Sequence, residues 1–154
     1  MEKFIIIKSR KFRVLEECLD LSSMGLTSCD IEPLASMPNL ERLNLRGNKI
    51  TDLSPLGGLI KLTCLSLWDN QVCDLSPLAG LTDLEYLDLS ENQISDLSPL
   101  GGLTNLSELY LNKNQISDLS PLKNLVNLKR LYSYQNNFDE EQIKLISGYT
   151  RIIL

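Results

Sequence analysis

The chain of 154 residues contains no histidine, and this absence removes many catalytic arrangements. Without an imidazole, neither a histidine general base nor a serine–histidine or cysteine–histidine pair can be built. Cysteine is scarce as well, and no two cysteines have the two-residue separation of a paired zinc-ligand motif. We therefore expect free thiols, no bound metal or cofactor and no enzyme activity. The four cysteines are Cys18, Cys29, Cys64 and Cys73.

Long apolar runs and an excess of positive charge are also missing. No run approaches the roughly 18 apolar residues that span a bilayer. The apolar run Phe4–Ile7 precedes its basic residues, whereas a secretory signal has the reverse order. The formal net charge of -5 disfavours a general nucleic-acid binder, which needs a basic surface. These features predict a cytoplasmic monomer without nucleic-acid or membrane contacts.

Internal repetition is the dominant feature of the sequence. Four units, at 40–61, 62–83, 84–105 and 106–127, follow the pattern L-x-x-L-x-L-x-x-N-x-[IV]-x-D-L-S-P-L-x-x-L-x-x, with a period of 22. Degenerate units lie on both sides, so the array extends over 18–138. Because a stacked array must cover the core at its two ends, we predict an N-terminal cap at 1–17 and a C-terminal cap at 139–154.

Each part of the unit predicts a local structure. The L-x-L segment alternates with the period of a strand, and stacked units place such strands side by side in a parallel sheet. The Ser-Pro step predicts the start of a helical turn, with serine as N-cap and proline in the first helical position. The remaining residues are too few for a long helix, so we expect 3₁₀ or single-turn helices.

Two polar positions recur in every regular unit. The ninth position is always asparagine, and a buried amide that repeats at a bend predicts a ladder of hydrogen bonds to the backbone. The thirteenth position is always aspartate, which suits a turn or a helix cap. Four equivalent carboxylates lack the contrasting environments that acid–base catalysis needs. We interpret both positions as structural.

At L-x-x-L-x-L-x-x-N-x-I-x-D-L-S-P-L, the sequence resembles the 22-residue class of leucine-rich repeats. That class includes bacterial internalin-like proteins and the nuclear regulatory subunit of a serine/threonine phosphatase. The D-L-S-P-L motif is most similar to the bacterial branch. The resemblance implies an α/β fold: a right-handed solenoid with a parallel concave sheet and short 3₁₀ or helical turns on the convex side. It also implies protein binding through the concave sheet.

The predicted caps have their own signals. Phe4–Ile7 is typical of a strand that covers the first repeat, and the closing 152–154 segment is expected to pack. Asp139 is a candidate N-cap of a terminal helix that Gly148 would end, with Ile143 and Ile146 covering the core. The basic residues of 8–13 favour a solvated strand edge, while contact with nucleic acid or an acidic membrane is the alternative.

Function is expected at the strand positions that vary between units. Positions two, three, five, seven and eight face the concave side, and they hold the only tryptophan and four of the five tyrosines. Exposed aromatic residues on a sheet are typical of binding hot spots, although stacking between neighbouring strands is the alternative. Residues 62–105 contain seven acids and no Lys or Arg, which suggests a partner with a basic patch. The predicted binding residues are Arg46, Trp68, Asp69, Glu85, Tyr86, Asp88, Glu91, Glu108, Tyr110, Tyr132 and Tyr134.

The sequence leaves two classes of function open. The favoured one is a protein–protein interaction module that uses the concave face. The other is a passive scaffold or assembly subunit that uses its edges or ends. An enzyme ranks below both, because a shallow sheet excludes little water from a reacting group.

Overall fold

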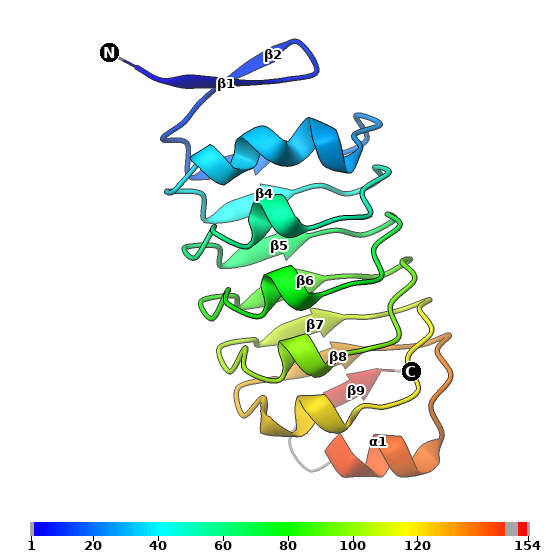
Figure 1. The fold of residues 1–154 in the computed structure, drawn as a ribbon. Coiled ribbons are helices and arrows are strands. Elements are labelled where there is room, and N and C mark those ends of the chain that lie inside the picture. The colour runs from blue at the N-terminus through cyan, green and yellow to red at the C-terminus, as the bar shows by residue number, and fades with distance from the viewer. Residues whose placement is uncertain (1, 147–150, 154) are drawn as a thin grey trace.

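The computed structural model describes residues 2–146 and 151–153. Seven parallel strands form one sheet, and their order in the sheet is their order in the chain. Each coil of the chain therefore lies beside the next, as Figure 1 shows. The predicted leucine-rich-repeat solenoid is confirmed. Its strands are β3 (Cys18–Asp20), β4 (Arg42–Asn44), β5 (Cys64–Ser66), β6 (Tyr86–Asp88), β7 (Glu108–Tyr110), β8 (Arg130–Tyr132) and β9 (Arg151–Ile153).

Short 3₁₀ helices cover the side opposite the sheet (Figure 1). In the second regular unit the backbone N–H of Ser76 donates to Asp74 Oδ1 at 2.8 Å, so the repeated aspartate stabilises the turn that leads into each helix. The predicted serine N-cap is wrong, because the helix already begins at the serine and Leu75 is the cap residue. The 3₁₀ helices are η1 (Ser28–Ser36), η2 (Ser54–Leu56), η3 (Ser76–Leu78), η4 (Ser98–Leu100) and η5 (Ser120–Asn124).

The core is a stack of leucine layers between the sheet and the 3₁₀ helices. The strand register aligns equivalent residues, so that Leu43, Leu65 and Leu87 are direct neighbours. All three are buried, as are the leucines of the turns. A single coil cannot bury these side chains, and each coil gains its apolar burial from the coils on either side.

A ladder of buried asparagines joins successive coils, as the ninth position predicts. Asn92 Oδ1 accepts the backbone N–H of Val72 at 2.9 Å, and Val72 belongs to the preceding coil. Its Nδ2 donates to Leu67 O in that coil and to Leu89 O in its own coil, both at 3.0 Å. Each asparagine thus satisfies backbone groups of two coils at once. Asn48, Asn70, Asn114 and Asn136 make the equivalent bonds.

The eighth position of each unit has a left-handed backbone. Gly47 has a φ of 67° there, whereas Asp69, Glu91, Lys113 and Gln135 each have a φ of 55°. Glycine adopts this conformation without steric cost, and the other residue types do not. Four coils therefore carry a strained residue just after the end of the strand, at the margin of the predicted binding face.

Separate elements cover the two ends of the solenoid. Strand β1 (Phe4–Ile7) pairs antiparallel with β2 (Arg10–Arg13), and its inner side chains, Ile5 and Ile7, are buried beside η1. Helix α1 (Glu140–Ile146) packs on η5 at the other end, with Ile146 buried and Ile143 half-buried. The predicted N-cap of α1 is confirmed, since Asp139 Oδ1 accepts two backbone N–H groups of its first turn.

Some sequence expectations fall outside the described residues. Gly148 and Leu154 lie beyond them, so the expected end of α1 and the packing of the last residue stay predictions. Within the described residues, no helix has the length and apolar character needed to cross a bilayer.

The ladder predicts a large difference between two asparagine variants. Asn92→Ala leaves the buried N–H of Val72 without its partner. It also removes one of the two asparagine donors to Leu67 O and to Leu89 O, so the free energy of unfolding should fall by about 3 kcal/mol. Asn105→Ala removes one bond to Thr82 O on an exposed surface and should cost about 1 kcal/mol or less. Urea unfolding of the two variants checks this, and equal losses would show that the ladder is not a major source of stability.

The left-handed position predicts a stabilising substitution. Gln135→Gly removes the steric cost of a φ of 55° and should raise the free energy of unfolding by about 1 kcal/mol. Gln115→Gly is the matched control at an exposed position of the preceding coil, outside the residues with positive φ. There the added backbone freedom should lower stability. Thermal melts compare the two variants, and a loss of stability in both would contradict the role given to backbone strain.

Candidate functional site

The sheet presents one open face, formed by the first and third residues of each strand and by the residues flanking the strand. The middle residue of β3–β8 is a buried leucine, so its two strand neighbours point away from the core. Stacking of the coils then arranges the open face in rows. One row contains Cys18, Arg42, Cys64, Tyr86, Glu108 and Arg130, and the next contains Asp20, Asn44, Ser66, Asp88, Tyr110 and Tyr132.

Three of the predicted tyrosines form a continuous strip across the two rows. The ring centroids of Tyr86 and Tyr110 are 5.3 Å apart with the planes tilted by 44°. Tyr110 and Tyr132 stack at 4.4 Å with an interplanar angle of 3°. All three side chains are partly exposed, and Tyr134 beyond them is 42% exposed. The predicted tyrosines are therefore partly exposed on the open face, and they also stack on one another, as in the alternative interpretation of the sequence.

Polar contacts hold this strip in place. Tyr110 Oη donates to Glu108 Oε2 at 3.1 Å, and Arg130 Nη1 donates to Glu108 Oε1 at 2.5 Å. Burial, followed by the bond to Glu108, raises the pKa of the Tyr110 hydroxyl above its ordinary value. Burial and the nearby Asp88 raise the pKa of Tyr86 to about 12. Both hydroxyls therefore stay neutral to a higher pH than an ordinary tyrosine, and the rings serve as uncharged contact surfaces.

The structure divides the predicted acidic residues into two groups. Glu91 pairs with Lys113 at 2.6 Å and Glu108 pairs with Arg130, so both acids already have a cationic partner from the next coil. Among the described residues, neither Asp69 nor Glu85 forms an ion pair, and both are exposed. The exposed pairs add little stability, but they reduce the negative charge that these two acids offer to a partner.

Asp88 differs from Asp69 and Glu85 because it is half-buried, within the row that also holds Ser66 and Tyr110. Burial raises the pKa of this carboxyl, although Oδ1 accepts the backbone N–H of Ser90 at 3.0 Å and Arg46 opposes the shift. A partly desolvated carboxylate interacts more strongly with an incoming cation than one in open water. Asp88 is consequently the strongest candidate for pairing with a basic side chain of a partner.

Trp68 and Arg46 form one unit beside the ends of the strands. The guanidinium carbon of Arg46 lies 3.5 Å from the centroid of the Trp68 ring, a close cation–π contact between neighbouring coils. The indole is partly buried, and it lines the same hollow of the open face as Asp88. Two of the predicted residues, Arg46 and Trp68, therefore hold each other in a fixed arrangement before any partner binds.

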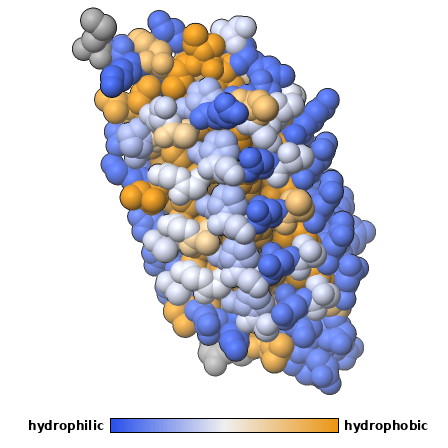
Figure 2. Space-filling model, in the orientation of Figure 1, coloured by the Kyte–Doolittle hydropathy of each residue, from blue (hydrophilic) through white to orange (hydrophobic). Residues whose placement is uncertain are grey.

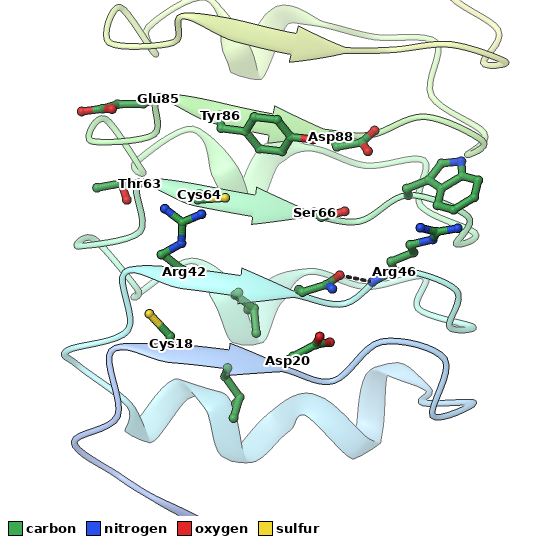
Figure 3. Close-up of a pocket in the computed structure, with 14 residues that line it drawn as sticks. Cys18, Asp20, Arg42, Arg46, Thr63, Cys64, Ser66, Glu85, Tyr86 and Asp88 are labelled. Carbon is green, nitrogen blue, oxygen red and sulfur yellow. Dashed lines mark hydrogen bonds between the residues drawn. The ribbon is translucent and has the colours of Figure 1, made fainter.

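A hollow of about 790 Å³ lies on the open face between β3 and β6 (Figure 3). Its lining includes small side chains, notably Cys18, Cys64 and Ser66, and larger ones such as Arg42 and Tyr86. The predicted binding residues include five that line this hollow, Arg46, Trp68, Glu85, Tyr86 and Asp88, and leave out the others. The missed lining residues include Cys18, Asp20, Arg42, Asn44, Cys64 and Ser66.

A signal for the hollow was available in the sequence. Cys18, Cys64 and Ser66 are small residues at outward strand positions, whereas each of the strands β6–β8 has a tyrosine and a charged residue there. A change from small to large side chains along a stacked face must leave a depression. The thiols of Cys18 and Cys64 are free and belong to strands separated by β4. Two strand spacings are about 9.6 Å, too far for a disulfide.

Comparison with known proteins agrees with this architecture. The family model described as "Leucine Rich repeats (2 copies)" matches residues 17–58, 38–80, 60–102 and 82–124. An internalin (inlF) from Listeria monocytogenes is 35% identical with a TM-score of 0.81, and the match covers 94% of this chain and 46% of that protein. No curated protein matches the chain.

Two other solved structures share the fold at lower identity. The internalin C2 of Listeria monocytogenes is 28% identical, with a TM-score of 0.60 and coverage of 89% of this chain and 80% of that one. A leucine-rich-repeat protein of Leptospira interrogans is 26% identical, with a TM-score of 0.61 and coverage of 79% and 39%. The chain thus spans less than half of the inlF and Leptospira proteins. The family matches and the repeated coil geometry show that this chain belongs to the leucine-rich-repeat family.

Proposed function

We propose that this protein is an interaction module that binds another protein on the open face of its sheet. Leucine-rich repeats commonly mediate protein–protein interaction, and members of this type are in general binding modules rather than enzymes. One observation carries the proposal for this face: a strip of three partly exposed tyrosines borders a hollow of about 790 Å³ on one sheet. Aromatic anchors beside a recess are the usual composition of a binding hot spot.

The two parts of the face suit different features of a partner. The hollow accepts a projecting side chain. Glu85 and Asp88 favour a basic one at the β6 end of the hollow, whereas Arg42 and Arg46 line the part beside β4. The tyrosine strip is flatter and offers rigid apolar area at a low cost in side-chain entropy. We therefore infer a partner with a Lys or Arg that enters the hollow beside Asp88 and an apolar segment that lies along Tyr110 and Tyr132.

A scaffold function is the second candidate, and specific contacts favour it. The tyrosines stack on one another, and the ion pairs of Glu91 and Glu108 connect neighbouring coils. Such contacts can serve rigidity alone, with assembly at the edges or ends of the solenoid. The hollow separates the two candidates, because a purely structural sheet gains nothing from a recess lined by Arg42 and Asp88.

We also propose a cytoplasmic location. The support is the four cysteines, which are free thiols, three of them exposed. Exposed thiols persist in a reducing compartment and tend to oxidise outside it.

Alanine variants of the tyrosine strip test the proposed function. Affinity capture with the full chain identifies the partner, and calorimetry then compares the variants. Tyr110→Ala and Tyr132→Ala should each weaken binding by about 2 kcal/mol, roughly 30-fold, if they are hot spots. Their melting temperatures should fall only modestly, because the rings lie outside the leucine core. Lys123→Ala in η5 is the control on the opposite side. If all three variants bound the partner with the affinity of the parent chain, the binding site would not be on the sheet, and the scaffold function would be supported.

The raised pKa of Asp88 predicts how binding depends on pH. A basic partner prefers the carboxylate, so affinity should be full above the pKa of Asp88 in the free protein and should fall as the pH drops through it. This decline begins at a higher pH than an ordinary aspartate would give, because burial raises that pKa. In Asp88→Asn, this pH dependence should disappear.

Asp20 provides the matched control within the same hollow. The backbone N–H of Ser22 donates to its carboxylate, and that bond lowers its pKa. Asp20→Asn should therefore leave the pH dependence of binding in place over the range where Asp88 titrates. A pH profile that is unchanged in Asp88→Asn would remove Asp88 from the contact.

A further inference from the structure

The hairpin of β1 and β2 forms the N-terminal end of the molecule and belongs to a separate two-stranded sheet (Figure 1). Its register pairs Phe4 with Arg13 and Ile6 with Lys11. The alternate residues of β1 point into the core, so these four side chains lie on the outward face of the hairpin. We call this surface, together with Leu15, the hairpin face.

Large apolar side chains are exposed on the hairpin face. Phe4 is 40% exposed, Ile6 is 65% exposed and Leu15 is 69% exposed. Figure 2 shows hydrophobic residues gathered at this end of the molecule with hydrophilic residues beside them. Apolar side chains that cluster at a rim of charge are typical of a contact surface rather than of chance exposure.

The same segment concentrates positive charge in an acidic chain. Residues 3–13 contain five Lys or Arg and no acid, with Glu2 before them and Glu16 and Glu17 after them, whereas the whole chain has 15 cations and 20 acids. Two of the cations contact the first coil: Lys8 Nζ donates to Gly25 O at 3.0 Å and lies 3.8 Å from Asp30 Oδ2, and Arg10 Nη1 lies 3.7 Å from Met24 Sδ. Lys11 Nζ lies over the Phe4 ring at 4.0 Å, and Arg13 is 3.8 Å from Glu2 with both side chains more than 60% exposed. Lys11 and Arg13 thus remain accessible to an external anion.

We propose that the hairpin face docks onto the surface of an anionic lipid bilayer. Its apolar side chains would enter the interfacial layer while Lys11 and Arg13 pair with lipid phosphate or carboxylate groups. A nucleic acid would satisfy the cations and leave Phe4, Ile6 and Leu15 in water. A second copy docked face to face would bring like charges together. An anionic bilayer satisfies both components of the surface.

This contact is independent of the open face of the sheet. The hairpin lies at the end of the coil stack, so a bilayer there leaves strands β4–β8 free along the length of the molecule (Figure 1). The protein could then hold a partner beside a membrane. The basic run that the sequence suggested as a solvated edge becomes, on this proposal, one half of a lipid contact.

Vesicle co-sedimentation of the full chain tests the proposal. The probes are vesicles of phosphatidylcholine alone and vesicles that contain about 30% phosphatidylserine, which have a negative surface potential. We expect sedimentation with the anionic vesicles only, and less of it as salt is raised. Two double variants test the two components of the surface. One combines Ile6→Ser and Leu15→Ser, and the other combines Lys11→Gln and Arg13→Gln. Each should weaken partitioning to the anionic vesicles about tenfold or more. Their melting temperatures should stay close to that of the parent chain, because these side chains are exposed.

Matched controls separate the hairpin face from general effects. Ile60→Ser with Val126→Ser removes apolar side chains that are 62% and 72% exposed in other coils, and Lys49→Gln with Lys123→Gln removes cations elsewhere. Both controls should bind vesicles as the parent does. Equal weakening in controls and hairpin variants, or no sedimentation with anionic vesicles, would overturn the proposal. The proposal would also be overturned if the parent chain did not bind vesicles but bound heparin or self-associated, and if the hairpin variants lost that binding.

Discussion

The buried asparagine of each coil is the interaction on which the rest of the structure depends. Its oxygen and nitrogen bind backbone groups of two successive coils, as Asn92 does with Val72, Leu67 and Leu89. These bonds have one geometry, so they fix the spacing and register of each coil relative to the previous one. The leucine layers then close over the core, and outward side chains at equivalent positions stand in rows. An asparagine that formed hydrogen bonds only within its own coil would not fix the register between coils.

The repeated elements could be predicted from the sequence because each unit obeys local rules that its neighbours share. The strands, the 3₁₀ turns, the asparagine ladder and the Asp139 cap all follow from residue type and spacing. Features that depend on contacts between side chains of different coils were harder to predict from the sequence. The pairs of Glu91 with Lys113 and Glu108 with Arg130 require the register of adjacent strands. The hollow requires several small side chains to lie together, and the cap position of Leu75 depends on the actual turn geometry.

The open face combines a rigid scaffold with variable side chains. Tyr110 and Tyr132 are held by stacking and by the contacts of Glu108, while the hollow beside them is lined by small side chains and by charged ones such as Arg42 and Asp88. A partner that binds such a face loses little free energy in ordering it, because the rows are already in place. Specificity then depends on a few residues, with Asp88 selecting charge and Trp68 shaping the wall. The same framework with other side chains in these rows would bind another partner.

Site-directed photo-crosslinking is the most direct test of the claim that this face is the binding site. A photoreactive residue at Ser66 lies within the hollow on the sheet, and one at Ala79 lies at the end of η3 on the opposite side. In the native cell, we expect one discrete protein adduct from Ser66 and none of that mass from Ala79. An adduct of the same protein from Ala79 alone, or equal yields from both positions, would contradict binding on the open face.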